Sequence, residues 1–550
     1  MTEPIARRTL LRAAGVAAGT AAIASPALLG GSSAQAADGY FRHGVASGDP
    51  LPDGVLLWTR VTPTVDATPG SGKGPAGTVA WQVAADPAFA TVVGSGAAQT
   101  GPERDHTVKV EVTGLSPATT YWYRFGYADA WSPTGRTLTA PAADAEVSSL
   151  RAGVVSCSNW EAGHFAAYQL LRQRDDLQLV LHLGDYLYEY GTGEYGAGAI
   201  GATGGTVIRP VEPKHEVLNL SDYRIRHGHY KTDPHLQALH ASVPWLITWD
   251  DHEVANDAWS GGAENHDPAT EGSYAARKAA AHQAYAEWMP VRMSAGNEIQ
   301  RRLRFGNLAE FTMLDLRSYR SQQAGGKEVD NPARTVTGDA QMAWLKTGLS
   351  ESSARWKLVG NSVMISRLDI GALPAWLLGP LGELIGVPQN GAVLFNDQWD
   401  GYNADRNELV GHLRSSGTKN VVFLTGDIHT SWANELTTKD TGTTPAAVEF
   451  VVPSVTSDNI DDIVGAPPNS TTGPASLAIR LTNPHVKWVD TDHHGYGVLD
   501  VRPERVQLDY YFLADRTSPG SAASWARGYA VANGATRLAR QSAPASAATS

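Results

Sequence analysis

The sequence is short of cysteine, of long apolar runs and of basic clusters. Its one cysteine, Cys157, excludes a disulfide framework within the chain. No run of about 20 apolar residues follows the N-terminal segment, so no transmembrane helix is expected. Long basic runs are missing too, and 44 basic against 56 acidic side chains give a net charge of −12. These features argue against a nucleic-acid-binding surface.

The bulk composition is that of a packed globular protein. The hydrophobic fraction is 42%, and the chain has 16 tryptophans. A length of 550 residues exceeds what one hydrophobic core usually supports, so two domains are expected. We predict a monomer.

The N-terminus carries the pattern of an export signal. Arg7 and Arg8 precede a weakly apolar Ala/Gly-rich run that extends to Leu29, and Ala-Gln-Ala at 34–36 fits a cleavage site. Twin arginines before such a run resemble a Tat signal, and an ordinary Sec signal that carries two arginines is the alternative. We therefore expect residues 1–36 to be a signal peptide, the Tat machinery to be a partner, and the mature protein to be secreted and soluble.

Residues 38–140 predict an all-β domain. The strand patterns lie at 55–61, 78–84, 108–112 and 121–127. Residues 115–121 resemble the corner of fibronectin type III sandwiches, in which a tyrosine hydroxyl bonds back to the backbone. The expectation is a small β-sandwich with a scaffolding role, separated from the rest by an Ala/Pro-rich linker at 140–144.

Residues 148–516 alternate strands with helical segments and form the predicted catalytic domain. The periodicity predicts helices and further strands in turn: helices at 162–174 and 274–288, strands at 311–316, 356–359, 448–452 and 497–512. Residues 191–205 are too rich in glycine for regular structure and predict a mobile loop. The tail at 517–550 is predicted to be partly disordered, with a short helix near Trp525.

Four apolar runs end in side chains that commonly bind metals. Each run reads as a strand buried on both faces, and open α/β sheets place their ligands at the carboxyl ends of such strands. The polar residues at these ends are Cys157, Asp185, Tyr188, Asp250, Asp251, His252, Asp427 and His429.

This collection predicts one polynuclear metal site at a sheet edge. Several carboxylates at short range cannot all ionise without cations, whereas two or more cations turn the same cluster into a binding site. A tyrosinate together with a thiolate suits Fe³⁺, and purely oxygen-rich surroundings suit Ca²⁺.

Motifs that carry a family resemblance span nearly the whole mature chain. They are HGVASGDP at 43–50, LWTR at 57–60, SCS at 156–158, HLGDYLYEY at 182–190, WDDHEV at 249–254 followed by Asn256-Asp257, and TGDIH at 425–429. With them the sequence resembles the PhoD-type alkaline phosphatases, a branch of the calcineurin-like metallophosphoesterases, and the related secreted metal-dependent phospholipases D. The resemblance implies an α/β fold in which a small fibronectin-III-like β-sandwich precedes an αββα-sandwich catalytic domain.

The same resemblance implies one iron ion, one or two calcium ions, and a role for each motif residue. Cys157 and Tyr188 correspond to iron ligands, and Asp185 corresponds to a bridge between iron and calcium. His252 corresponds to a catalytic proton donor or transition-state stabiliser. The remaining implied ligands are Asp251, Asn256, Asp427 and His429.

The activity implied is hydrolysis of phosphate monoesters and diesters by a water that the metals activate. Phospholipids, cleaved as by a phospholipase D, and teichoic acids are candidate substrates. Arg209 or Arg226 could clamp the phosphate, and a solvated surface arginine is the alternative for either. Whether His493 or His494 lines the pocket is left open.

Two other functions compete with this interpretation. His485, Lys487 and Asp492 fit one H-x-K-x₄-D motif of the phospholipases D in which histidine is the nucleophile, although that mechanism usually needs two such motifs. A non-catalytic extracellular adhesin built on the β-sandwich is the second, and it leaves the carboxylate cluster unexplained.

Overall fold

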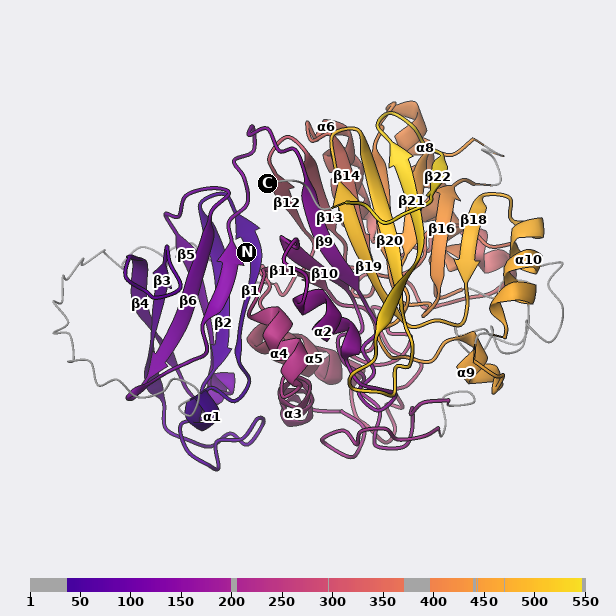
Figure 1. Ribbon diagram of the computed structural model, residues 1–550. Coiled ribbons are helices and arrows are strands. Elements are labelled where there is room, and N and C mark those ends of the chain that lie inside the picture. Colours follow the sequence, from indigo (N-terminus) through magenta and orange to yellow (C-terminus); the bar gives the residue numbers. More distant parts are fainter. Residues whose placement is uncertain are drawn as a thin grey trace, which may run out of the picture.

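The protein is described here by a computed structural model that covers residues 37–198, 205–294, 296–369, 396–438, 442, 444–468 and 470–546. Figure 1 shows a β-sandwich at the N-terminal end beside a larger α/β body. The predicted signal peptide, part of the glycine-rich loop and the end of the tail lie outside the described residues. No helix among the described residues is long and apolar enough to cross a membrane.

The N-terminal domain is a β-sandwich, as predicted. One sheet has the order β4-β3-β6-β7 with β8 paired to β6, and it packs on β1, β2 and β5. The bounds are α1 (Ala37–Tyr40), β1 (Val45–Leu51), β2 (Gly54–Arg60), β3 (Gly77–Ala84), β4 (Val92–Thr100), a 3₁₀ turn (Pro102–Arg104), β5 (Thr107–Thr113), β6 (Thr120–Tyr127), β7 (Ala130–Trp131) and β8 (Gly135–Leu138). The predicted tyrosine corner is present, since the Ser116 amide donates to the Tyr121 hydroxyl at 2.9 Å.

A ten-stranded sheet runs from the α/β body into the sandwich. Its order is β22-β21-β20-β19-β9-β10-β11-β1-β2-β5, with β1 parallel to β11 at Gly48 and Trp245. Only glycine fits at position 48, because a Cβ there would collide with the carbonyl oxygen of Pro290. The linker at 140–144 therefore does not hold the domains apart: they share one sheet.

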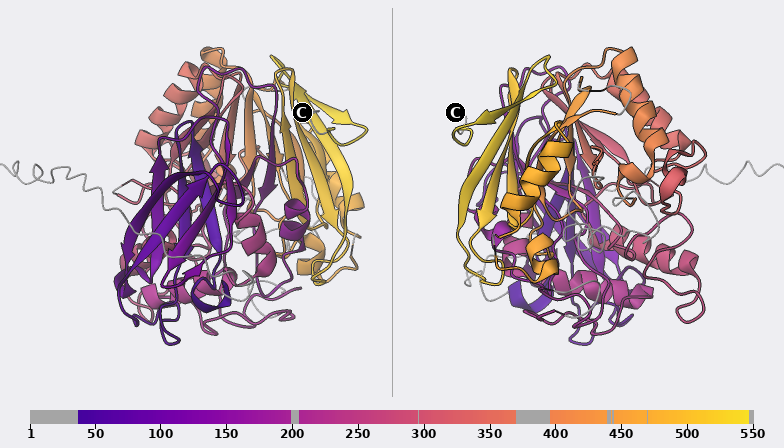
Figure 2. Two further views of the ribbon diagram at one scale, coloured as in Figure 1. Left: turned by 60° about the vertical axis from the view of Figure 1, so that its left-hand side comes forward. Right: turned by 90° about the vertical axis from the view of Figure 1, so that its right-hand side faces the viewer.

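The α/β body has two facing sheets with helices outside, as the αββα prediction states (Figures 1 and 2). Its part of the first sheet comprises β9 (Leu150–Val155), β10 (Leu179–Leu183), β11 (Trp245–Thr248), β19 (Gly495–Val501), β20 (Arg505–Leu513), β21 (Ala523–Ala532) and β22 (Leu538–Gln541). The second sheet, in the order β12-β13-β14-β15-β17-β16-β18, comprises β12 (Arg301–Phe305), β13 (Ala309–Met313), β14 (Trp356–Asn361), β15 (Val421–Thr425), β16 (Ser431–Leu436), β17 (Ala447–Val451) and β18 (Val486–Asp490).

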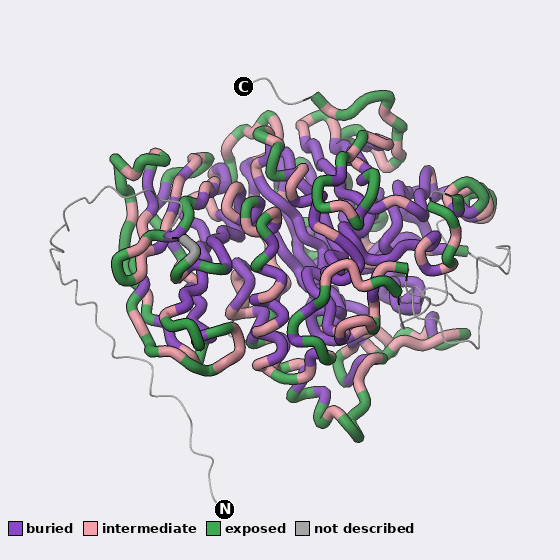
Figure 3. Tube along the Cα trace, turned by 60° about the horizontal axis from the view of Figure 1, so that its bottom comes forward, coloured by how far each residue is buried: buried purple, intermediate pink, exposed green. Residues whose placement is uncertain are grey.

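Helices cover the outer faces of both sheets. The helices are α2 (Ala166–Arg172), α3 (Leu220–Tyr230), α4 (Pro234–His240), α5 (Tyr274–Trp288), α6 (Asp339–Glu351), α8 (Asn403–Ser415), α9 (Ile460–Val464) and α10 (Thr472–Thr482), with 3₁₀ turns at Gly326–Asp330 and Trp399–Gly401. Strand β10 is continuously apolar because both of its faces are buried. Leu181 packs between the two sheets, while Val180 packs under α2 and α4. Exposed segments lie mainly at the periphery in Figure 3, and the strands that lead to the site are buried.

Two sequence predictions about the C-terminal part are wrong. Residues 497–512 form the hairpin β19–β20 rather than one strand, because residues 502–504 turn the chain. The segment around Trp525 is strand β21, not a helix, since it pairs with β20 along its whole length. Tertiary pairing overrides the helical preference of its alanines.

Candidate metal centre

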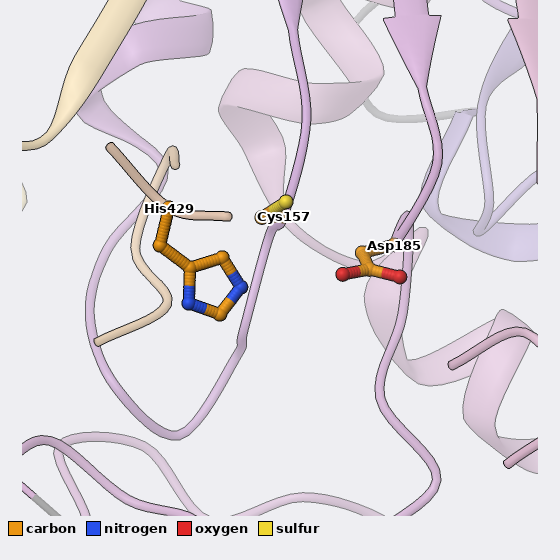
Figure 4. Close-up of side chains that lie close together, drawn as sticks. All are labelled: Cys157, Asp185 and His429. Carbon is orange, nitrogen blue, oxygen red and sulfur yellow. The ribbon is translucent and has the colours of Figure 1, made fainter. Parts of the chain in front are cut away.

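The four predicted strand ends meet between the two sheets rather than at the edge of one. Strands β9, β10 and β11 are parallel neighbours in the first sheet, whereas β15 belongs to the second. Their carboxyl ends bring Cys157, Asp185 and His429 together, as Figure 4 shows. The prediction of a single sheet edge is thus corrected: Asp427 and His429 approach from the opposite layer.

Four of the converging residues have a left-handed backbone. The φ angle is 59° at Cys157, 54° at Asp185, 66° at Asp427 and 55° at His429. This region costs an L-residue about 1 kcal/mol or more, and such strain gathers at functional sites. The chain turns sharply after each strand, which brings these side chains into the space between the sheets.

Among the described residues, Asp185 belongs to every group of ligand atoms that lies close enough to hold an ion. Three such groups have all their ligand atoms within 4.8 Å of one another, and each is made of buried or nearly buried residues. They are Cys157–Asp185–His429, Asp185–Asp251–His252 and Asp185–Asp250–Asp251–Asp427. The Oδ1 atom of Asp185 is buried with no hydrogen-bond partner among the described residues. An orphaned carboxylate oxygen fits a cation at this position.

His429 presents a nitrogen lone pair to the first group. Its Nδ1–H donates to the carbonyl oxygen of Asp458 at 2.6 Å, which leaves Nε2 as the basic atom. Burial lowers the pKa of His429 to about 3, so the ring is neutral near pH 7. A neutral ring with its second nitrogen fixed by a carbonyl is the form in which histidine binds metals.

Tyr188 joins the same group through its hydroxyl. The oxygen lies 3.0 Å from Asp185 Oδ2 and 3.2 Å from His429 Nε2, and Ser457 Oγ donates to it at 2.6 Å. Burial raises the pKa of the Tyr188 phenol and of the Cys157 thiol. A bound cation reverses that direction, because it favours the phenolate and the thiolate.

His252 is held by a buried carboxylate. Its Nδ1–H donates to Glu189 Oε2 at 2.8 Å, and its ring packs against Tyr188 with 4.1 Å between centroids. Burial acts to lower the pKa of His252, but the carboxylates of Asp251 and Glu189 outweigh it and raise the pKa. Glu189 was not singled out from the sequence, although it lies in the HLGDYLYEY motif.

Asn256 and Glu253 lie beside the groups and make other contacts. The side-chain amide nitrogen of Asn256 donates to Glu264 at 3.0 Å, and the backbone N–H of Asn256 donates to Glu189 at 2.7 Å. The role of Asn256 as a ligand stays a prediction. Glu253 accepts backbone N–H groups of Tyr186 and Asp250 at 2.6 and 2.8 Å, which fastens the two strand ends to each other.

Arg317 and Asp397 were missed in the sequence and lie inside the site. Arg317 follows β13 and forms ion pairs with Asp250 at 2.6 Å and Asp397 at 2.8 Å. The available signal was the apolar strand that ends in Asp315-Leu316-Arg317, the same pattern that identified the other strand ends. Asp397 carries no such signal, because it precedes a 3₁₀ turn.

The two arginines suggested as phosphate clamps have structural contacts instead. Arg226 is fully buried and donates to the carbonyl oxygens of Glu212, Tyr190 and Pro213. Arg209 pairs with Asp233 at 2.7 Å and lies over the Trp160 ring. All three nitrogen atoms of the Arg226 guanidinium are thus engaged, whereas Arg209 keeps one buried nitrogen, Nη2, without a hydrogen-bond partner among the described residues.

The histidine-nucleophile motif does not form a site. His485 Nε2 contacts the Arg367 carbonyl oxygen at 2.8 Å, Lys487 pairs with Glu435, and Asp492 accepts from the Thr471 amide. His493 and His494 both line a cavity of about 1190 Å³, together with Trp488, Phe512 and Arg516. Arg516 pairs with Asp458, the residue whose carbonyl oxygen holds His429.

The fold and the site together define a metallophosphoesterase-like α/β hydrolase behind an antiparallel β-sandwich. Residues 152–510 match the model of the PhoD-like phosphatase family, and residues 24–141 match that of the PhoD-like phosphatase N-terminal domain. The chain therefore belongs to the PhoD-like phosphatase family, and it is a hydrolase of phosphoric esters.

Two comparisons with individual proteins agree with this assignment. The chain is 37% identical over 499 residues to alkaline phosphatase D of Bacillus subtilis (strain 168), covering 88% of this chain and 79% of that protein. The solved structure titled "Structure of PhoD" superposes with a TM-score of 0.80 at 35% identity, covering 92% of this chain and 93% of that one.

Proposed function

We propose that this chain is a secreted metal-dependent phosphoesterase that cleaves phosphate monoesters and diesters at the Asp185 centre. The observation that carries the proposal is that all three groups of potential ligand atoms share Asp185, whose Oδ1 atom is an orphan among the described residues. Iron fits the side of the centre that holds Cys157, Tyr188 and His429. Calcium fits the carboxylate side of Asp250, Asp251 and Asp427.

When bound, the cations would supply positive charge that neutralises the phosphate oxygens and lowers the pKa of the attacking water. The protein's own residues prepare that site. Ser457 donates a hydrogen bond to the Tyr188 oxygen, which favours the phenolate form. Asp458 and Glu189 fix the rings of His429 and His252 through their Nδ1 atoms.

His252 is the proposed proton donor to the leaving oxygen. Glu189 accepts a hydrogen bond from the Nδ1–H of His252 at 2.8 Å, so Nε2 is the ring nitrogen left for proton transfer. Because Glu189 is fully buried, its charge acts on the ring with little screening by water.

The substrate test compares three esters with the purified holoenzyme. We expect p-nitrophenyl phosphate and bis-p-nitrophenyl phosphate to be hydrolysed in a chelator-sensitive way, and phosphatidylcholine turnover decides whether lipids are included. Protein that contains no iron and hydrolyses none of the three would refute the proposal.

The iron assignment has a spectroscopic test. A tyrosinate–Fe³⁺ bond gives a visible charge-transfer band, and we expect Tyr188→Phe to lose it. A variant that keeps the band unchanged would remove Tyr188 from the ligand set.

Export by the Tat route is part of the proposal and rests on the twin arginines at positions 7 and 8. We expect an Arg7→Lys/Arg8→Lys variant to stay inside the cell, whereas the wild-type protein reaches the medium. Normal secretion of that variant would favour the Sec route instead.

A further inference from the structure

We propose that Arg317 is a positioning residue for the carboxylate side of the metal centre. By clamping Asp250 and Asp397 it sets Asp251 and Asp427 beside Asp185, in an arrangement that binds a divalent cation. The inference rests on the metal centre of the proposed function, and it concerns the calcium side alone.

The Arg317 guanidinium binds two carboxylates, and it contacts each of them through two nitrogen atoms. Nε and Nη2 donate to the two carboxylate oxygens of Asp250 at 2.6 and 3.0 Å. Nη1 and Nη2 donate to those of Asp397 at 2.8 and 2.9 Å. Two bidentate pairs fix both carboxylate planes, which a lysine ammonium cannot do.

The same guanidinium reaches the other two acids of this side at longer range. Nη2 lies 3.4 Å from Asp427 Oδ1 and 3.7 Å from Asp251 Oδ1. Three segments that are far apart in the sequence therefore meet at the Arg317 side chain, which is 3% exposed. Arg320 adds a second cation at Asp397, with its Nη1 atom 3.2 Å from the Oδ1 atom that Arg317 Nη1 also contacts.

Arg317 positions the four acids but does not neutralise all of their negative charge. One guanidinium faces Asp250, Asp251 and Asp427 in addition to Asp397, so it neutralises only part of their charge. The remaining negative charge is what a divalent cation would neutralise.

The iron side is independent of this clamp. Within the part of the chain that the structure describes, every ion pair of Arg317 goes to Asp250, Asp251, Asp397 or Asp427. Cys157, Tyr188 and His429 are instead supported by Ser457 and Asp458. Loss of the clamp should therefore weaken calcium binding and leave iron binding unchanged.

The test measures calcium affinity and iron content separately on iron-loaded protein from which calcium has been stripped. We expect Arg317→Lys to weaken calcium binding about 10-fold and Arg317→Gln about 100-fold, the range typical of residues that orient metal ligands. Iron content and the visible band should match the wild type, and high calcium should restore the kcat of Arg317→Lys. Arg320→Lys is the matched control, because among the described residues Arg320 shares Asp397 with Arg317 but forms no ion pair with Asp250, Asp251 or Asp427; this variant should bind calcium nearly as the wild type does.

Three results would overturn the inference: unchanged calcium affinity, parallel loss of iron and calcium with a lower melting temperature, or a raised KM at saturating calcium. The second result would make Arg317 a structural residue, and the third would make it a substrate ligand. Wild-type protein that binds neither ion would instead refute the metal centre itself, so the two failures can be distinguished.

Discussion

The metal centre and the junction between the two domains are both buried polar clusters, and the first is built of acidic side chains whereas the second is built of basic ones. Burial raises the pKa of Asp185 and Asp427 at the metal centre. At the junction, burial lowers the pKa of Lys231 to about 7 and also lowers those of His43 and His240. In both places, burial favours the neutral form of each side chain.

The two clusters differ in what surrounds their titratable side chains. At the metal centre, Asp185 and Asp427 have left-handed backbones, and Asp185 Oδ1 lacks a hydrogen-bond partner among the described residues, which suits an ion that arrives from outside. The junction bases have aromatic neighbours: the Lys231 nitrogen lies 4.8 Å from the Trp58 ring centre and 4.9 Å from that of Tyr186. The acids can therefore stay charged and bind, whereas the bases lose their protons and pack.

Metal removal should give the largest effect, because it acts on the acids alone. Stripping the protein with a chelator should abolish hydrolysis and lower the free energy of unfolding by about 4 kcal/mol for each ion present at 1,000 times its Kd. Thermal unfolding before and after chelation, and after metal is returned, measures this. An unchanged melting temperature after complete removal would contradict a charge cluster that needs cations.

The Glu189–His252 pair should give the next largest effect. Glu189→Gln keeps the side-chain shape but removes the charge that faces the ring at 2.8 Å, so we expect kcat to fall about 100-fold with metal content unchanged. Glu264→Gln is the control, since Glu264 contacts Asn256 rather than His252.

A double variant sharpens this prediction. If Glu189 acts through His252, then Glu189→Gln combined with His252→Ala should be no slower than His252→Ala alone. Additive losses would mean that the two residues act separately.

Lys231 should make stability depend on pH in the alkaline range. Between pH 7 and about 10.5 the unfolded lysine holds a proton that the folded one has lost, so the free energy of unfolding rises with pH by up to about 4 kcal/mol. Lys231→Met should remove most of this rise and stabilise the protein near pH 7. Denaturant unfolding at several pH values measures the slope.

Lys109 provides a comparison for the Lys231 result. Burial lowers its pKa to about 8, and its nitrogen donates to the carbonyl oxygens of Ala286 and Val291 at 2.8 Å. Lys109→Met should therefore remove a smaller part of the slope. Equal slopes in wild-type protein and both variants would show that neither lysine is neutral when folded.

The sequence predicts the acidic cluster better than the basic one, for a physical reason. Asp185 and Asp427 follow apolar strands directly, so their position is a local property of the chain. Lys231 and His240 lie on or beside short helices, and their surroundings include residues of β1 and β2 in the other domain as well as the rings of Tyr186 and Trp245. Lysine is ordinarily exposed, and nothing local marks this one as buried.

Arg317 and the shared sheet show the same limit. The partners of Arg317 lie 67, 80 and 110 residues away in the chain, and the joining of β1 to β11 depends on a close approach at Gly48. Strand β21 was missed because its alanines favour helix locally. The partners of Arg317, the shared sheet and strand β21 all depend on contacts between distant segments. The strand ends, by contrast, can be predicted from apolar runs and motif spacing.

Tyr186 connects the two clusters and offers the smallest and most selective test. Its hydroxyl accepts from Lys231 at 2.9 Å and lies 2.9 Å from His240 Nε2, while its backbone neighbours Asp185. Tyr186→Phe leaves the lysine without that partner, so we expect a loss of about 1–2 kcal/mol in the free energy of unfolding. Iron content, calcium affinity and kcat should stay at wild-type values, because the hydroxyl faces away from the ligand groups toward the junction. A change in metal affinity would show instead that the basic cluster acts on the acidic one through this residue.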